Sequence, residues 1–191
     1  MRTRVTNPCH VYDLRTDQEL IAALNAGDAS AFDALYYRYR DWVVRLAYRF
    51  TRDRDDALDA LQDTFAYLAR KFPGFVLTAS MTTFLYPVVK NSAIAIRRKR
   101  RRLVTGSEES IEVPVVESTD PESSRQALAQ VLARIAEPSR EVLLMRFVDG
   151  LKLDEIAAAL GVPVGTVKSR MHNALEALRG DERTRRYFEV G

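Results

Sequence analysis

Two adjacent blocks of opposite charge divide the sequence into an N-terminal and a C-terminal part. Residues 97–102 are six consecutive basic side chains, whereas residues 103–124 contain six acidic side chains and no basic one. A single packed domain rarely contains such a boundary, but two domains joined by a linker often do. Residues 103–123 are rich in Ser, Glu, Pro and Thr and lack a sustained helical period, so we predict an acidic, flexible linker there, with a short strand-like piece at residues 113–116.

The apolar residues on both sides of this linker recur at spacings of three and four, which is the period of an amphipathic helix. Only eight glycines and seven prolines are present, so little interrupts such helices. The predicted helices cover residues 17–25, 29–50, 54–71, 83–102, 124–136, 138–148, 154–160 and 164–179. We therefore predict an all-α protein of two small helical domains, divided as follows: an extension at 1–16, a first domain at 17–102, the linker at 103–123, a second domain at 124–180 and a tail at 181–191.

The composition excludes several classes of protein. No apolar run reaches the length of about 20 residues that a membrane-spanning helix needs, and residues 1–12 do not resemble a signal peptide, so we expect a cytoplasmic protein that does not insert into membranes. One cysteine, Cys9, and two histidines, His10 and His172, exclude a disulfide framework and argue against a zinc site. The sequence contains no phosphate-binding glycine loop and no nucleophile elbow. We expect neither an enzyme nor a bound cofactor or metal.

Residues 151–178 have the pattern of a helix-turn-helix unit, because a short amphipathic helix, a glycine-containing turn and a second helix follow one another. The first turns of a recognition helix contact base edges and phosphates of duplex DNA. Gly165 and Thr166 are small enough for a phosphate to approach the helix N-terminus. A compact helical pair with solvated basic residues would have the same pattern. The candidate DNA contacts in these turns are Lys168, Ser169, Arg170 and His172.

The basic run at residues 97–102 predicts binding to a polyanion with a steep salt dependence, because six bases exceed what the end of a helix needs. Asn91, Arg98 and Arg102 share one stripe of the predicted helix, away from its apolar face. An Asn can hold an exposed base and an Arg can hold the phosphates beside it, although Asn91 could also be an ordinary surface residue. Three aromatic residues on or beside the preceding loop could stack on an unpaired base or could belong to the core: Phe75, Phe84 and Tyr86.

The third predicted helix has an acidic stripe, formed by Asp56, Asp59 and Asp63 at spacings of three and four. We expect this stripe to face away from the apolar side chains of Leu58, Leu61 and Phe65. Like charges at this spacing repel by about 0.2–0.5 kcal/mol per pair. The stripe is therefore either a solvated face or a docking face for a basic protein partner.

Together these segments resemble a bacterial RNA polymerase sigma factor of the extracytoplasmic-function (group 4) type. Residues 56–72 resemble conserved region 2.2, residues 83–102 resemble regions 2.3 and 2.4, and residues 140–178 resemble region 4 with its recognition helix. The resemblance implies a transcription initiation factor whose partners are core RNA polymerase and promoter DNA. The alternative is a stand-alone helix-turn-helix regulator, which would leave the first domain and its acidic stripe without a role.

The resemblance implies three contact surfaces. The first docks on the clamp helices of the largest polymerase subunit through Asp56, Asp59, Gln62, Asp63 and Phe65. The second, formed by the loop at residues 74–82 and the helix after it, captures unpaired bases of the minus-ten element without ATP, with Phe84, Asn91, Arg97, Arg98 and Arg102 on the strand. The third binds the minus-thirty-five duplex through Thr166, Lys168, Ser169, Arg170 and His172.

The sequence departs from the family pattern at Leu58, where a Glu is frequent, and this departure removes one acid from the docking motif. Some family members that lack the acidic motif are switched by a threonine kinase, and Thr51 precedes the acidic helix between basic residues. Phosphorylation would add a charge of about −1.5 to −2 at a helix N-terminus, where negative charge is favoured. Thr51 could instead be a capping residue, and an anti-sigma protein is the usual alternative regulator. The other departures are Phe84 for a Trp, Pro87 near a helix start, and Lys152 for a capping Ser.

Overall fold

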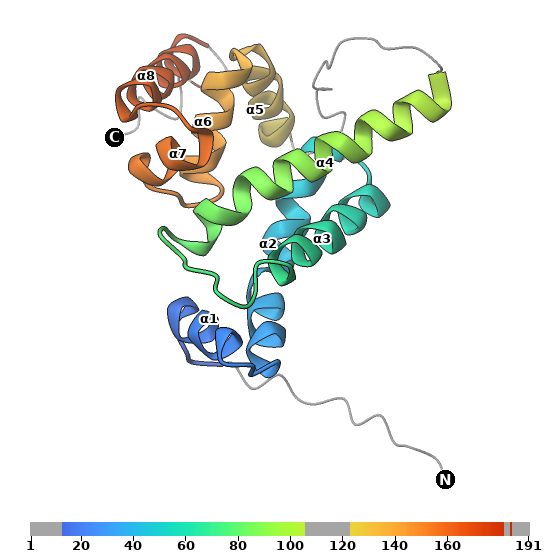
Figure 1. The fold of residues 1–191 in the computed structure, drawn as a ribbon. Helices are drawn as coiled ribbons and strands as arrows, with labels where there is room; N and C mark the ends of the chain where they lie inside the picture. Colours follow the sequence, from blue (N-terminus) through green and yellow to red (C-terminus); the bar gives the residue numbers. More distant parts are fainter. Residues whose placement is uncertain (1–12, 106–122, 182–183, 185–191) are drawn as a thin grey trace.

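The computed structural model describes residues 13–105, 123–181 and 184, and this part of the chain contains eight α-helices and no β-strand (Figure 1). The prediction of an all-α fold is therefore confirmed, and each predicted helix is present within a few residues of its expected ends. Cys9, His10 and the strand-like piece expected at residues 113–116 lie outside the described residues, as do most of the expected linker and tail. The helices are α1 (Asp17–Asn25), α2 (Ser30–Thr51), α3 (Arg54–Ala69), α4 (Met81–Thr105), α5 (Ser123–Arg134), α6 (Glu137–Phe147), α7 (Leu153–Leu160) and α8 (Val164–Gly180).

Local capping sets the ends of the first helices. The backbone N–H of Thr16 donates to the carboxylate of Glu19 at 2.6 Å, and the Thr16 hydroxyl accepts from the N–H of Glu19 at 3.3 Å. Asp53 begins α3, because its carboxylate accepts from the N–H groups of Asp55 and Asp56 at 2.9 and 3.0 Å. These bonds satisfy N–H groups that have no partner inside the helix. Arg52, between α2 and α3, has a φ of 58° in the left-handed region, which turns the chain sharply.

Helices α2, α3 and α4 pack against one another and form the core of the N-terminal half. Phe65 lies in this core, 4% exposed, with its ring 4.9 Å from the ring of Tyr36. The predicted apolar face of α3 was partly wrong: Leu58 is 40% exposed, whereas Asp56 is 9% exposed. The reason is that α4 crosses the N-terminal end of α3, where Arg100 reaches the Asp56 carboxylate at 3.0 Å and lets that charge be buried.

The C-terminal half is a helix-turn-helix unit built on α6. Helix α7 ends at Leu160 and is followed by Gly161, whose φ of 64° is in the left-handed region that glycine adopts without strain, and α8 begins three residues after Gly161. Ile156 of α7 and Val167 of α8 are fully buried between these helices. Val131 lies in the last turn of α5, and Ile135 follows this helix. Both residues form a second apolar cluster with side chains of α6 and α8.

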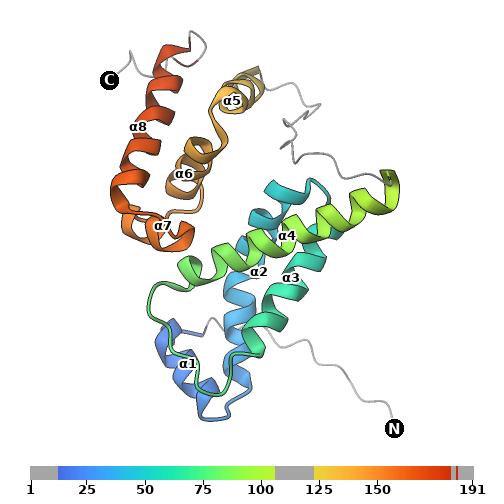
Figure 2. The same cartoon turned by 45° about the horizontal axis from the view of Figure 1, so that its top comes forward.

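The two halves pack on each other, with α4 lying against α7 (Figure 2). One continuous apolar cluster contains Leu85 and Val89 of α4 together with Met145 and Ile156 of the C-terminal half. Two separately tethered domains do not by themselves imply such a contact, so the shared cluster is a finding of the structure. Among the described residues, no helix is both long and apolar enough to cross a membrane.

Candidate nucleic-acid interface

A cavity of about 740 Å³ opens between α3, α4 and the loop that connects them. Its lining combines the aromatic ring of Phe84 with polar groups that can recognise a planar heterocycle, among them Tyr67 and Asn91. Phe84 is partly buried, with its ring 4.8 Å from Phe75 and 6.3 Å from Tyr67. The aromatic residues expected near the loop therefore do gather there, with the exception of Tyr86, which is fully buried on another face of α4.

The loop that forms one wall of this cavity is held by Asn25, the last residue of α1. Its side-chain oxygen accepts from the N–H groups of Gly74 and Phe75 at 2.7 and 3.1 Å, and its amide donates to the Phe75 carbonyl at 2.9 Å. One side chain thus joins two segments that lie 50 residues apart in the sequence. The sequence analysis missed Asn25, because an Asn at a helix end is common and gives no signal of a distant partner.

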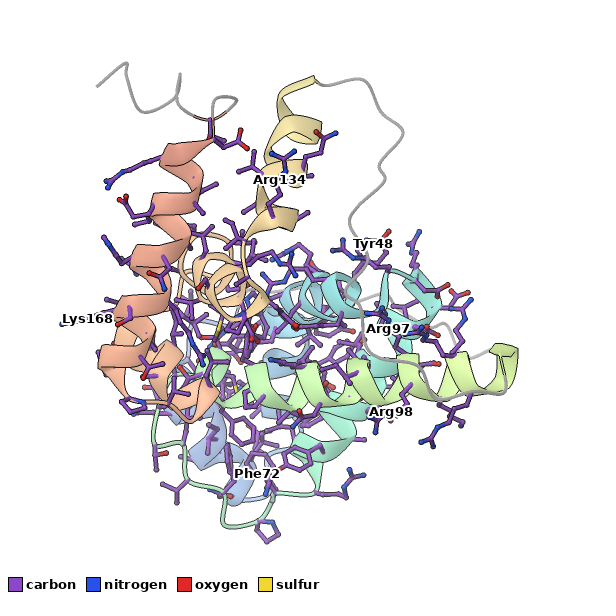
Figure 3. The ribbon with its side chains drawn as sticks, turned by 90° about the horizontal axis from the view of Figure 1, so that it is seen from above. Tyr48, Phe72, Arg97, Arg98, Arg134 and Lys168 are labelled. Atoms are coloured by element: carbon purple, nitrogen blue, oxygen red, sulfur yellow. The ribbon has the colours of Figure 1, made fainter. Side chains whose placement is uncertain are left out.

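A basic groove of about 640 Å³ continues from the cavity along α4. Asn91 lines both the cavity and the groove, and Arg98, Lys99 and Arg102 line the groove with it. Arg97 lies on the other side of the α4 ribbon from Arg98 (Figure 3), where it donates to the carbonyl of Phe50 at 3.2 Å. The structure therefore brings four of the five predicted strand contacts, Phe84, Asn91, Arg98 and Arg102, to the cavity and groove and leaves Arg97 outside them.

Arg100 belongs to neither surface, because it pairs with two carboxylates at the start of α3. Its guanidinium lies 2.5 Å from the Asp53 carboxylate and 3.0 Å from that of Asp56. These bonds raise the pKa of Arg100. The pKa of Asp53 is lowered, first by the hydrogen bond from the N–H of Asp56 and then by Arg100.

The predicted docking face of α3 is only partly exposed. Asp59, Gln62 and Asp63 are exposed, and Asp63 also accepts from the Ser92 hydroxyl at 2.9 Å and lines the cavity. Asp56 and Phe65, in contrast, are buried, as described above, and the structure does not bring them to this face. Helical spacing places the exposed Leu58 beside Gln62, four residues later on the outer side of the helix.

Helix α8, which the sequence predicts to be a recognition helix, presents its polar side chains outward. Lys168, Ser169 and His172 are exposed, and Thr166 and Arg170 are partly exposed, so all five predicted duplex contacts reach the surface. Figure 3 shows Lys168 directed away from the body of the molecule. The Ser169 hydroxyl donates to the Gly165 carbonyl at 3.0 Å within the helix.

Thr51 is buried at the end of α2, with 7% of its surface exposed. Its hydroxyl donates to the carbonyl of Asp53 at 2.9 Å and so holds the turn into α3. Burial lowers the pKa of the neighbouring Arg52, and the positive charges of Arg140, Arg97 and Arg49 lower it further. The capping role that the sequence allowed for Thr51 is filled by Asp53, whose carboxylate accepts from the N–H groups of Asp55 and Asp56.

Two family models match the halves in the order seen in the fold. The Sigma-70 region 2 model matches residues 35–103, and the Sigma-70, region 4 model matches residues 125–178. Two solved structures share the fold over nearly their whole length. CnrH in complex with the cytosolic domain of CnrY has a TM-score of 0.61 at 21% identity and covers 92% of this chain and 99% of that one. RpoE in complex with the anti-sigma factor NepR from Bartonella quintana has a TM-score of 0.58 at 22% identity, covering 85% and 99%.

Sequence relatives agree with the family models. The ECF RNA polymerase sigma factor SigM of Mycobacterium tuberculosis is 33% identical over 160 residues, which are 84% of this chain and 81% of the relative. The ECF RNA polymerase sigma-E factor of Escherichia coli is 31% identical over 177 residues, covering 85% and 92%. The chain therefore belongs to the ECF RNA polymerase sigma factors, the family that its sequence resembles.

Proposed function

We propose that this group 4 sigma factor directs core RNA polymerase to promoters by reading the minus-thirty-five duplex with α8 and capturing unpaired minus-ten bases with α4 and the preceding loop. The observation that carries this proposal is the position of Asn91, which lines both the aromatic cavity and the basic groove. A base in the cavity would then continue directly into a backbone held by Arg98, Lys99 and Arg102.

The energetics of this arrangement suit melting without ATP. Extruding a base from a duplex costs a few kcal/mol. Stacking one base on an aromatic side chain returns about 1–3 kcal/mol. The strand's phosphates add a salt-dependent attraction to the groove. No covalent step is required of the protein, so it acts as a DNA-binding initiation factor and not as an enzyme, in the cytoplasm where polymerase and template meet.

Docking on core polymerase is assigned to the exposed part of α3. Asp59 and Gln62 would contact the clamp helices of the largest subunit, with Leu58 adding an apolar contact beside Gln62. Asp63 would also form part of the cavity wall, because its carboxylate accepts a hydrogen bond from Ser92 of α4. Asp56 supports this surface from below through Arg100, and Phe65 supports it as part of the core.

The test is a reconstitution with core polymerase. The full chain should co-elute with core and produce specific transcripts from a promoter library, while binding duplex DNA poorly alone. Asn91→Ala should abolish opening of the minus-ten element without loss of core binding, and Gln18→Ala, an exposed change on α1, is the matched control. A protein that protects an operator duplex unaided and never co-elutes with core would be a stand-alone regulator instead.

Regulation is proposed at two places. An anti-sigma protein is one candidate, since the solved RpoE structure contains the anti-sigma factor NepR. A Ser/Thr kinase acting on Thr51 is the other, and the arginines around Thr51 would stabilise an added phosphate. Because the hydroxyl is buried, a kinase would need the last turn of α2 to open first. If Thr51→Glu and Thr51→Ala proteins bind core polymerase equally, the kinase proposal fails.

A further inference from the structure

Four arginine side chains lie around the turn between α2 and α3, and none of them lines the cavity or the groove. Arg52 forms this turn, and its backbone N–H donates to the Tyr48 carbonyl at 3.0 Å. Arg97 of α4 reaches the same turn, because it donates to the Phe50 carbonyl at 3.2 Å. With the two further members, we call this set the arginine cluster: Arg49, Arg52, Arg97 and Arg140.

Two guanidinium N–H groups of the cluster are buried and have no acceptor. They are the Nε group of Arg52 and the Nη1 group of Arg49. The other amino group of Arg49 donates to the Asp149 carboxylate at 2.8 Å, whereas no carboxylate among the described residues pairs with Arg52. A buried donor without an acceptor is costly, and a charged donor is more costly than a neutral one. The two groups therefore point to a missing acceptor.

The end of α2 does not supply this acceptor. A cation is favoured at the C-terminal end of a helix, where carbonyl groups have no partner inside the helix. The Phe50 carbonyl at this end already accepts from Arg97, and the Tyr48 carbonyl accepts from the backbone of Arg52. The helix end thus explains the position of Arg97 and leaves the Arg52 side chain unexplained.

The positive charges of the cluster are also not balanced within it. Arg140 donates to two backbone carbonyls of α5 at 3.3 Å, and these are neutral acceptors. The charges of Arg140, Arg97 and Arg49 lower the pKa of Arg52 in addition to burial, which agrees with their proximity to it. Asp149 compensates one of these charges through its bond to Arg49. An anion at this place would relieve the remaining repulsion.

The donors suit a tetrahedral oxyanion. A guanidinium group binds phosphate oxygens through N–H groups of fixed geometry, and such charge-assisted bonds are strong where water is partly excluded. All four side chains of the cluster are partly exposed, so an ion can reach them from solvent. The basic groove assigned to the DNA strand is elsewhere, since Arg97 lies on the other side of the α4 ribbon from Arg98 (Figure 3).

We propose that the arginine cluster binds a phosphate group from solution, as inorganic phosphate or as part of a small phosphorylated molecule, with Arg52 Nε and Arg49 Nη1 as the central donors. The phosphate is held by hydrogen bonds and charge alone, and no bond to Thr51 is formed. It stabilises the turn between α2 and α3. The proposal is independent of the functions assigned above to the cavity, the groove and Thr51.

Binding is measured by NMR of the arginine Nε–Hε groups of the full chain, with inorganic phosphate added at constant ionic strength in sodium chloride. The Arg52 signal should shift and saturate, whereas the signal of Arg100, which is paired with Asp53, should not. Arg52→Gln should weaken phosphate binding by about tenfold or more, because it removes a charge-assisted donor. Arg54→Gln, the same charge change at an exposed position two residues later, should leave the affinity unchanged.

Thermal unfolding separates a binding role of Arg52 from a structural one. In chloride alone, Arg52→Gln should be at least as stable as the wild type, because it removes a partly buried charge that has no partner. Phosphate should raise the Tm of the wild type and of Arg54→Gln, since a ligand of the folded state stabilises it, and should not raise the Tm of Arg52→Gln. A lower Tm of Arg52→Gln in chloride would show a structural contact and overturn the proposal.

A labelled single DNA strand distinguishes the two sources of phosphate. Arg52→Gln should bind the strand as the wild type does, and Arg98→Gln should bind inorganic phosphate as the wild type does. A parallel loss of strand and phosphate affinity in Arg52→Gln would assign the cluster to the DNA backbone instead. An equal loss of phosphate affinity in Arg52→Gln and Arg54→Gln, or an Arg52 signal that does not saturate, would show diffuse attraction only. Each of these results would overturn the proposal without affecting the test of Asn91→Ala.

Discussion

Replacing Asn25 by Ala tests whether the loop beside the cavity must be held in place for base capture. The substitution removes all three hydrogen bonds that join α1 to Gly74 and Phe75. A protein hydrogen bond contributes about 0.5–1.5 kcal/mol net. Because Gly74 is exposed and Phe75 is partly exposed, hydrogen bonds to water replace part of the loss. We expect the held conformation of the loop to be destabilised by about 1–3 kcal/mol. This corresponds to a factor of roughly 5 to 150 in the equilibrium between the held and the released loop.

The effect should be confined to the loop, because the core of α2, α3 and α4 does not depend on Asn25. Amide exchange of residues 74–79 should accelerate by that factor, while exchange in α3 stays unchanged. With core polymerase bound, 2-aminopurine at the captured minus-ten position should show weaker base capture, and affinity for the minus-thirty-five duplex should be retained. Asn25→Asp keeps the two acceptor contacts and loses the donor, so it should fall between wild type and Asn25→Ala.

Gln18→Ala is the matched control, since Gln18 is exposed on the same helix. Unchanged exchange in the loop of the Asn25→Ala protein would show that these hydrogen bonds do not hold it. Faster exchange with undiminished base capture would show that the loop is held but that its position does not matter to the DNA. Either result refutes the reasoning.

Three further predictions follow from individual contacts. Arg98→Gln should reduce the slope of log affinity against log salt concentration for the single strand by about 0.7. Arg100→Gln should leave this slope unchanged, because Arg100 is paired with Asp53 at the start of α3. Equal slopes for the two variants would contradict the division of α4 into two faces. The hydrogen bond from Arg15 lowers the pKa of Asp13 from 3.8 to about 2, so its contribution to stability is present above pH 3.8 and is lost as the pH falls through about 2. Relative to an unstructured peptide at the same pH, amide exchange in α1 should accelerate over this range, and Arg15→Gln should reduce that acceleration. Gly161→Ala places a side chain at a φ of 64° and should destabilise the helix-turn-helix unit by about 1–2 kcal/mol in thermal unfolding, with Gly180→Ala as a control.

The sequence predicted the helices well because their signals are local. Apolar spacing, the capping residues Thr16 and Asp53, and the glycine after α7 act within a few residues of the structure that they specify. The outward face of α8 was predicted for the same reason, since a regular helix fixes which residues share a side.

The order of the two regions along the chain, the positions of the helices and the polar face of α8 were thus determined by the sequence alone. The tertiary structure decided what each side chain contacts. Arg98 lines a groove, whereas Arg97 and Arg100 are bound elsewhere, and Asp56 is buried while Leu58 is exposed. Asn25, Glu141 and Asp149 reach partners in distant segments. Periodicity gives the direction of a side chain relative to its own helix axis. The partner depends on which helix crosses that point, and the crossing is set by packing of the whole apolar cluster.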